Sequence, residues 1–570
     1  MFDSDIDVQV QSLILMIQKT RHNDKMARNS IGIAESGHAS FSALDLFDVY
    51  RVKALSFAHS LLGSEDFVRK VVQDLHLGNK VLEEKLQELL ETIIESIEGF
   101  HGKMEEDEEN DSAERNSIKS EKLQKLLASC LERVFEATLA IIPTRTFVKM
   151  LANLLAFEQP KNVQRKALEV LNARLSQQQQ ESSLEEFLIN DQLPLVLEKL
   201  SLLSLNDSGD VIQQLALMCV KSLAKISTHQ STDDDNTIIL QHMQKLAKSI
   251  VKKTFFNSLK QGPVIASALL CIVELFNCLG AHAVIHVKPF ITWILDLVSE
   301  QKINELNPVV LNSLVVSVQR TMDNFGGFLN PFYPRLVIAT CEMTAWHQNQ
   351  EVENLVENKN EFRQTAQRIK QLQMALSKGI PTHSLIQISK QCFDDVKEKP
   401  YAIIALSNII KENVGELEKT EILASSTPLL DFFMHAFKYR EEYDGHDENH
   451  EVVVDLVEKS VGEAFMTFAL KLALDDFKPL YYRLFNLALD SHNLDGITTL
   501  FHITEQIANK LKSLFSFVCE MLVQKATTVL QDLSKKAEEV SMNDYKDSRR
   551  RIIATSYVLD ALASMYKYNR

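Results

Sequence analysis

Prolines recur at helix-forming positions in the middle of this chain, at spacings that limit how it can fold. Pro263 and Pro308 each precede a long apolar helical pattern and lie 45 positions apart. Pro289 and Pro331 are each followed by Phe and lie 42 positions apart. Proline fits the first turn of a helix, because its missing N–H would have had no hydrogen-bond partner there. We therefore expect each of the four prolines to open a helix, with two helices in each repeat.

A repeated helix pair with a period of about 40 to 47 residues is typical of HEAT and armadillo proteins. Only 16 Gly and 12 Pro interrupt the 570 residues, and apolar residues recur at helical rather than strand spacing. A chain of this length exceeds one ordinary core, whereas a solenoid grows by stacking repeats. We predict an all-α fold, a HEAT-type α-solenoid whose stacked antiparallel helix pairs form a superhelix.

Four segments share one pattern, a cap or turn residue followed by Val and by small or aliphatic residues one turn later. They begin at Asn162, Asp210, Pro263 and Pro308. We expect them to be the second helices of successive repeats. The helix expected at 264–279 is apolar nearly all round, as a helix between neighbouring repeats should be, and Gly280 follows where a helix C-cap is expected.

Composition divides the chain into four regions. Residues 1–100 are expected to form N-terminal helical repeats, and residues 123–375 carry the clearest HEAT repeats. Residues 376–570 form a C-terminal helical module. Between the first two regions, residues 101–122 are almost wholly polar and acidic and show no helical period. Such a segment buries too little surface to offset its ordering entropy, so we predict a mobile acidic linker, either a solvated insertion or a tail for a basic partner. 

In the C-terminal module we expect Pro381, Pro400 and Pro428 to mark new helices.

Charge and cysteine usage exclude some functional classes. The formal net charge of −16 excludes a general electrostatic attraction to nucleic acid, so that protein partners or local basic faces are expected. The seven cysteines form no C-x-x-C pair, which is typical of core thiols in a reducing compartment. The longest apolar stretch, Val264–Val273, is stopped by Glu274 and is shorter than the roughly 20 residues of a membrane span, and the acidic start is unlike a signal peptide. We expect a soluble intracellular protein without a membrane partner.

No phosphate-binding, dinucleotide-binding or nucleophile-elbow motif occurs in the sequence. His446 and His450 have the spacing of a zinc motif, but Glu448 stands one place later than that motif requires. We interpret this segment as a solvated loop. The sequence therefore predicts no enzyme, no catalytic residue, no metal, no cofactor and no small-molecule substrate.

Two basic clusters are the candidate contact sites for RNA or protein partners. Lys245, Lys248 and Lys252 follow one another at steps of 3 and 4, which places them on one helical face. The residues expected to pack on the opposite face are Met243, Ala247, Ile250 and Val251. This cluster is either an ordinary solvated face or a binding surface.

Arg549, Arg550 and Arg551 form the second cluster, and as neighbours on a helix they point in different directions. Some of them can reach phosphates or acidic partners, or all of them can be solvated. The residues expected to pack inward beside them are Ile552, Ile553, Tyr557 and Leu559.

Four segments of the C-terminal region carry a family resemblance. They are 431–440, 461–472, 477–485 and 507–515, and the strongest element is Phe477-Lys-Pro-Leu480 with aromatic residues behind it. This region resembles the C-terminal module of the HEAT repeat-containing protein 1 family, which yeast nomenclature calls the U3 small nucleolar RNA-associated protein 10 family. Members of that family are several times longer, so the chain resembles a C-terminal portion that lacks the final repeats.

The resemblance implies a non-enzymatic scaffold of the U3 snoRNP and the small-subunit processome. Such a scaffold acts in pre-rRNA processing and 18S maturation, is linked to RNA polymerase I transcription, and resides in the nucleolus of the nucleus. The implied partners are processome proteins of the early pre-rRNA-binding subcomplex, the U3 snoRNP and pre-rRNA. The alternative is a HEAT-repeat transport receptor or a phosphatase-type scaffold that binds protein partners.

Overall fold

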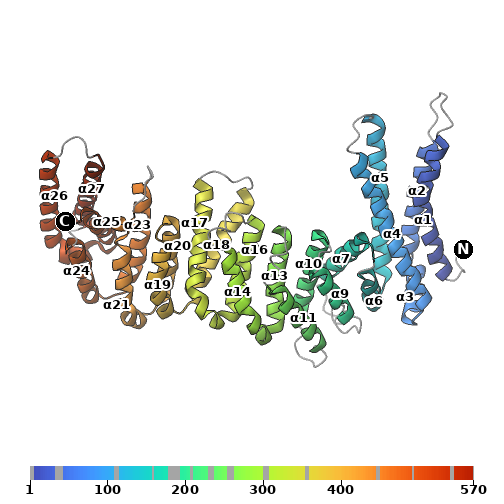
Figure 1. The fold of residues 1–570 in the computed structure, drawn as a ribbon, viewed down its shortest axis with the longest axis horizontal. Helices are drawn as coiled ribbons and strands as arrows, with labels where there is room; N and C mark the ends of the chain where they lie inside the picture. The colour runs from blue at the N-terminus through green and yellow to red at the C-terminus, as the bar shows by residue number, and fades with distance from the viewer. Residues whose placement is uncertain are drawn as a thin grey trace. The chain divides into compact units, whose positions relative to one another are not determined.

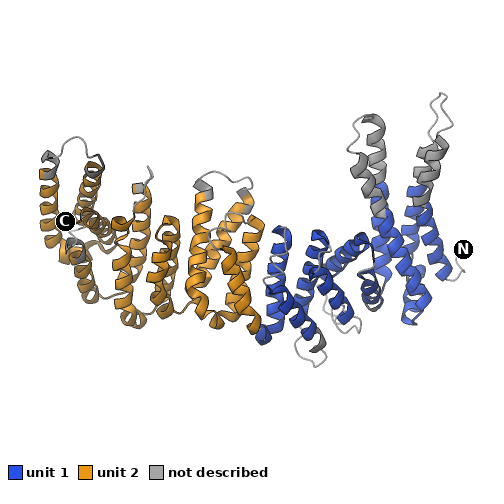
Figure 2. Ribbon diagram, in the orientation of Figure 1, with its two compact units in different colours: residues 1–283 blue, residues 284–570 orange. Residues whose placement is uncertain are grey.

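The computed structural model of the chain consists of two compact units, residues 1–283 and residues 284–570 (Figure 2). It describes residues 6–31, 43–107, 114–156, 159–177, 193–205, 209–228, 237–252, 262–298, 307–352, 359–443, 450–490, 493–539 and 545–568. Within these ranges every regular element is an α-helix or a short 3₁₀ helix (Figure 1). The predicted all-α fold is confirmed.

In the first unit the helices pack as two rows. The helices are α1 Ile6–Ile31, α2 Ala43–Leu62, α3 Glu65–His76, α4 Lys80–Asp107, α5 Glu114–Ile141, α6 Thr144–Leu154, α7 Lys161–Gln177, α9 Leu193–Leu205, α10 Asp210–Ser227, α11 Thr237–Ile250, α13 Gly262–Leu279 and the 3₁₀ helix η2 Gly280–Ala283. The row α4, α7, α10 and α13 packs neighbour on neighbour, and so does the row α6, α9 and α11. Because α7, α10 and α13 carry the pattern predicted for second helices, that prediction is confirmed in this unit.

Helix α13 shows why the repeats stack. Its apolar side chains are buried on more than one side, including Ala268, Leu269 and Ile272, because α10 and α11 both pack against it. Gly280 ends the helix with a φ of 51°, in the left-handed region where a side chain would be strained. The predicted helix and its glycine end are both confirmed.

The second unit continues the same construction. Its helices are α14 Val284–Val298, α16 Pro308–Phe325, η3 Gly326–Phe328, η4 Asn330–Phe332, α17 Tyr333–Val352, α18 Lys359–Gly379, α19 Thr382–Val396, α20 Pro400–Glu416, α21 Lys419–Ala436, α22 Tyr439–Glu442, α23 His450–Ala469, α24 Leu474–Asp490, α25 Leu494–Leu511, η5 Lys512–Val518, α26 Cys519–Glu539 and α27 Tyr545–Tyr568. One row runs through α16, α18, α20, α23, α25 and α27, and the other through α14, α17, α19 and α21. Each unit is therefore a HEAT-type stack of antiparallel helix pairs.

Most of the marker prolines stand at helix starts. Pro308 and Pro400 occupy the first turns of α16 and α20, and Asn307 caps α16 by accepting a hydrogen bond from the Val309 N–H at 2.9 Å. The predictions for Pro289 and Pro428 are wrong, because both lie inside helices, α14 and α21. Each removes one backbone hydrogen bond. Burial of the apolar residues around them keeps the helices continuous.

Two other prolines lie just outside α-helices. Pro381 is the N-cap residue of α19, and Pro331 lies in η4 immediately before α17.

The predicted acidic linker is partly helical. Helix α4 continues through Asp107 and α5 begins at Glu114, so that both ends of 101–122 are helical, while 108–113 lie outside the described residues. The charged residues there are mostly Glu and Lys, which favour helix and need no burial to do so. Mobility of this segment and the region boundaries at 122 and 375 stay predictions, and the two compact units meet at a different position.

Among the residues that the structure describes, two segments are long and apolar enough to cross a membrane by length and composition alone, Gly262–Val298 and Leu494–Lys535. An apolar stretch counted only up to its first charged residue missed both. In the first segment 67% of the most apolar window is buried inside the protein, and a 3₁₀ helix separates α13 from α14. A core helix of a folded repeat protein has the same composition.

Candidate functional site

The lysine cluster lies at the end of α11 and faces outward. Lys245, Lys248 and Lys252 are exposed. The four residues predicted on the opposite face are buried, namely Met243, Ala247, Ile250 and Val251. The amphipathic pattern read from the sequence is therefore confirmed, and the three ammonium groups are accessible to a partner.

The arginine cluster lies in the first turns of α27, where its members have different surroundings. Arg549 and Arg550 are exposed, and the Arg550 Nη1 lies 3.9 Å from an Asp495 carboxylate oxygen. Arg551 is half-buried and lines a groove of about 430 Å³ between α26 and α27. Arg549 therefore faces solvent, Arg550 lies near a carboxylate and Arg551 lines a groove.

The inward face predicted for α27 is wrong for two residues. Ile552 is 69% exposed and Leu559 is 51% exposed, while Ile553 and Tyr557 are half-buried. The buried stripe consists of Ala554, Val558, Ala561 and Met565. Steps of 4, 3 and 4 define that stripe, and Ile552 and Leu559 lie on the opposite side of the helix. Helix phase decides burial here, and side-chain size does not.

A buried polar network that the sequence did not reveal centres on Arg440 of α22. The Arg440 side chain is 6% exposed and binds Glu458 with two hydrogen bonds, from Nε at 3.0 Å and from Nη2 at 2.8 Å. Its Nη1 also donates to Glu451 at 2.7 Å, and its Nη2 donates to Asp455 at 2.6 Å. One guanidinium therefore binds three carboxylates, all on α23.

Glu458 extends the network to the next helices of the row. Its carboxylate also accepts hydrogen bonds from the Thr499 hydroxyl and from His502 at 2.8 Å, both on α25. The His502 ring stacks on Tyr557 of α27, with ring centroids 4.4 Å apart. Burial alone would raise the pKa of Glu458, but the hydrogen bonds from His502 and Arg440 and the charge of Arg440 lower the pKa to about 2. The carboxylate is therefore ionised in the folded protein.

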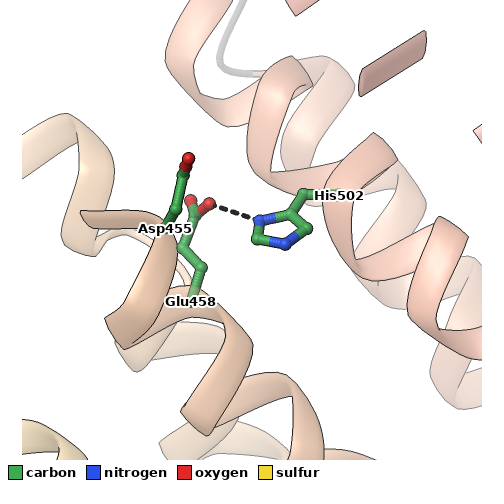
Figure 3. Close-up of side chains that lie close together, drawn as sticks. All are labelled: Asp455, Glu458 and His502. Atoms are coloured by element: carbon green, nitrogen blue, oxygen red, sulfur yellow. Dashed lines mark hydrogen bonds and ion pairs between the residues drawn. The ribbon is translucent and has the colours of Figure 1, made fainter. Parts of the chain in front are cut away.

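The same residues contain a group that could hold a metal ion. One donor atom from each of Asp455, Glu458 and His502 lies within 4.8 Å of the others, and Figure 3 shows the two acids on one helix and the histidine on another. The guanidinium of Arg440 already binds both carboxylates with its own positive charge. A divalent cation would have to displace it, so we interpret the cluster as a structural ion-pair network.

The histidine pair His446 and His450, considered from the sequence, lies outside the side chains that the structure describes.

An aromatic core joins the four segments that carry the family resemblance. Phe433 of α21 packs on Phe465 of α23 with centroids 5.4 Å apart, and Phe465 packs on Phe477 of α24 at 6.4 Å. Tyr481, one helical turn further, contacts Phe515 of η5 at 5.2 Å. Side chains from positions far apart in the sequence thus form one continuous cluster. The aromatic residues of these four segments therefore form the packing core of the C-terminal module.

A known domain family matches the C-terminal part of the chain. Residues 421–570 match a domain family described as the BP28CT (NUC211) domain. These residues include the aromatic core, the Arg440 network and the arginine cluster of α27.

Curated relatives match beyond that domain. HEAT repeat-containing protein 1 of Homo sapiens is 23% identical over 583 residues, which cover 98% of this chain and 26% of the human protein. The protein of the same name from Danio rerio is 23% identical over 542 residues, covering 91% of this chain and 24% of the relative. A HEAT repeat-containing protein 1 homolog from Drosophila melanogaster is 22% identical over 79% of this chain and 21% of its own length. The chain spans about a quarter of the length of these relatives.

Among solved structures, the crystal structure of Kap121p aligns with 98% of this chain and 54% of its own, with a TM-score of 0.45 and 12% identity. The structure of yeast importin-beta (Kap95p) aligns with 98% of this chain and 67% of its own, with a TM-score of 0.33 and 10% identity.

Proposed function

Because the chain belongs to the HEAT repeat-containing protein 1 family, we propose that it is a non-enzymatic scaffold of the small-subunit processome. In this role it supports pre-rRNA processing and 18S maturation and is linked to RNA polymerase I transcription. The observation that carries the proposal is the match of residues 421–570 to the BP28CT domain, together with relatives that align over most of the chain.

The construction of each unit supports a scaffold mechanism. Two rows of packed helices leave long outer surfaces, and each helix pair touches only its neighbours, so that many separate contacts can form along the chain. The Arg440 network suits this role as well. Both carboxylate oxygens of Glu458 already accept two hydrogen bonds each, from Arg440 together with Thr499 or His502, so this acid holds helices together.

The partners that we propose are processome proteins of the early pre-rRNA-binding subcomplex, the U3 snoRNP and pre-rRNA, in the nucleolus. Direct RNA contact would use the exposed lysine cluster of α11 and the exposed arginines of α27. With a net charge of −16, RNA binding through so few cations is weak and strongly salt-dependent. Most of the affinity for the assembly then comes from protein contacts.

Localisation and co-purification test the proposal together. The tagged chain is expressed in cells, and we expect a nucleolar signal and processome proteins with U3 RNA in the eluate. A variant with Lys245, Lys248 and Lys252 changed to Gln should keep the protein partners and recover less RNA. An exclusively cytoplasmic signal, with Ran or a phosphatase subunit in the eluate, would instead support the transport receptor or phosphatase-type scaffold.

A further inference from the structure

A groove of about 780 Å³ lies inside the second unit, where α17, α18 and α20 meet. Figure 1 shows these three helices next to one another, and each of them packs against the other two. Helices α16 and α23 continue the row on either side, so the groove is internal to the stack. Its volume is within the range of ligand-binding clefts. We call it the α18–α20 groove.

The relative position of α18 and α20 follows from the side chain of Asn413. Its Nδ2 donates to the carbonyl oxygens of Ser377 at 2.6 Å and Ile380 at 3.2 Å, so the last turns of both helices lie side by side. The two helices therefore run in the same direction. Counting back by equal numbers of residues places Gln373 of α18 at about the level of Asn408 of α20. Both residues line the groove, which thus extends along the two helices.

The floor of the groove is apolar and is held by its neighbours. Ile369 of α18 and Ala405 and Ile409 of α20 line it and are buried. On α17 the His347 ring also lines it, and this ring stacks on Phe362 with the ring centroids 3.7 Å apart. A floor that is already packed can cover a large apolar side chain without an ordering cost of its own.

Amide side chains border this floor. Gln373 donates to the Thr344 hydroxyl at 2.8 Å, whereas the amides of Asn408 and Gln348 make no hydrogen bond within the described part of the chain. A side-chain amide both donates and accepts, which is what the N–H and C=O groups of a peptide backbone require. A helix already pairs most of these backbone groups internally, while an extended segment leaves them available. The two amides therefore favour an extended peptide over a helix.

Two exposed charges of opposite sign lie on the facing walls, Lys370 of α18 and Glu412 of α20. Neither has an ion-pair partner among the described residues. By the same register Lys370 precedes Glu412 by about two turns, or about 10 Å along the groove. An extended chain rises about 3.3 Å per residue, so two of its residues three positions apart can reach both charges. A nucleic acid would be attracted by one wall and repelled by the other.

We propose that the α18–α20 groove binds an extended segment of a partner protein, in which large apolar residues stand between an acidic and a basic residue. The apolar side chains cover Ile369 and Ile409. The acid pairs with Lys370 and the base with Glu412. The amide of Asn408 hydrogen-bonds to the backbone of the segment. This inference goes beyond the proposed function and uses neither the processome role nor the nucleolar location.

The test uses the purified full chain and fluorescein-labelled octapeptides, whose binding is followed by fluorescence anisotropy. Two peptides carry Glu-Leu-Leu-Lys or Lys-Leu-Leu-Glu at the centre, since the segment can run in either direction, and a third carries Glu-Leu-Leu-Glu. We expect one mixed-charge peptide to bind about tenfold more tightly than the acidic peptide, or better, because Glu412 repels the second carboxylate.

A charge reversal on one wall separates recognition from a structural effect. Glu412→Lys should reverse the preference, so that the acidic peptide binds more tightly than either mixed-charge peptide. Glu136→Lys makes the same change at an exposed position of the first unit and should leave the preference as it is in the wild type. Asn408→Leu should weaken the mixed-charge peptide by about fivefold or more, since it removes a hydrogen-bond partner and keeps the volume.

The proposal is overturned if neither mixed-charge peptide binds, if Glu412→Lys keeps the wild-type preference, or if Asn408→Leu binds as tightly as the wild type. It is also overturned if a hydrocarbon-stapled helical form of the peptide binds more tightly than the linear form, or if single-stranded RNA displaces the peptide. None of these measurements depends on localisation or co-purification, so their result and that of the proposed function can differ.

Discussion

Removing the arginine at the centre of the buried network should open the C-terminal module locally. In an Arg440→Met variant, Glu458 loses two hydrogen bonds and its balancing charge while only 2% of it is exposed. Glu451 and Asp455 are 19% and 38% exposed, so their carboxylates can turn towards water. Most of the cost therefore arises at Glu458.

The size of the effect follows from that one uncompensated charge. Removing one partner of a buried ion pair costs about 3 to 5 kcal/mol. A loss of this size raises the equilibrium constant for local opening by roughly 150-fold to 4,000-fold. Because the chain has two compact units, one global unfolding transition is a poor measure, and hydrogen–deuterium exchange resolved by peptide is the better assay.

Faster exchange is expected in peptides from α23, α25 and α27, which the network joins, and unchanged exchange in residues 1–283. Two variants serve as controls. Arg483→Met breaks the pair with Asp431, in which both side chains are 55% exposed, and should cost less than about 1 kcal/mol. Adding Glu458→Gln to Arg440→Met removes the buried charge and should restore most of the protection.

The reasoning would be refuted if Arg440→Met exchanged no faster than Arg483→Met. It would also fail if the double variant were less protected than Arg440→Met alone, because the uncompensated charge of Glu458 would then not be the cause.

Three further predictions follow from the same structure. The folded pKa of Glu458 is about 2 against an ordinary value of 4.5, so its stabilisation of about 3 kcal/mol is complete above about pH 5 and is lost as the pH falls towards 2. Pulse proteolysis should show that the difference in stability between the wild type and Glu458→Gln becomes smaller over that pH range. A difference that does not change with pH would contradict the lowered pKa of Glu458. Leu269→Ala empties a fully buried site between α13 and its neighbours, should cost about 2 to 5 kcal/mol, and should raise exchange in the helices that pack against α13 without reaching the whole chain. Changing Lys245, Lys248 and Lys252 to Gln should lower the salt slope of single-stranded RNA binding by about 2, because each of the three phosphate contacts contributes roughly 0.7. An unchanged slope would exclude this face as the RNA-binding site.

The sequence predicted the parts of the fold that depend on local chemistry. Apolar periodicity and helix-end residues located α13 and α16, because Pro308 and Gly280 act on their own helix ends. The same rule failed at Pro289 and Pro428. At these two positions packing outweighs the loss of one hydrogen bond. Packing depends on neighbouring helices, which a short stretch of sequence does not show.

The network was missed for a related reason. Arg440, Glu458 and His502 lie on three helices, and no spacing in the sequence connects them. A signal was nevertheless present. Glu458 interrupts the buried apolar stripe of Val454, Val457 and Val461, where an acid is stable only with a partner. A charged residue on the core face of a repeat helix therefore predicts a cross-helix partner without identifying it.

That network also distinguishes the C-terminal module from the rest of the fold. In a stack of helix pairs each repeat contacts only its neighbours, and stability is a sum of local terms. Here Glu458 of α23 binds α22 and α25 at once, and His502 carries the contact on to Tyr557 of α27. The Arg440 guanidinium also lies 5.9 Å from the centre of the Tyr557 ring, so the network joins three successive helices of one row.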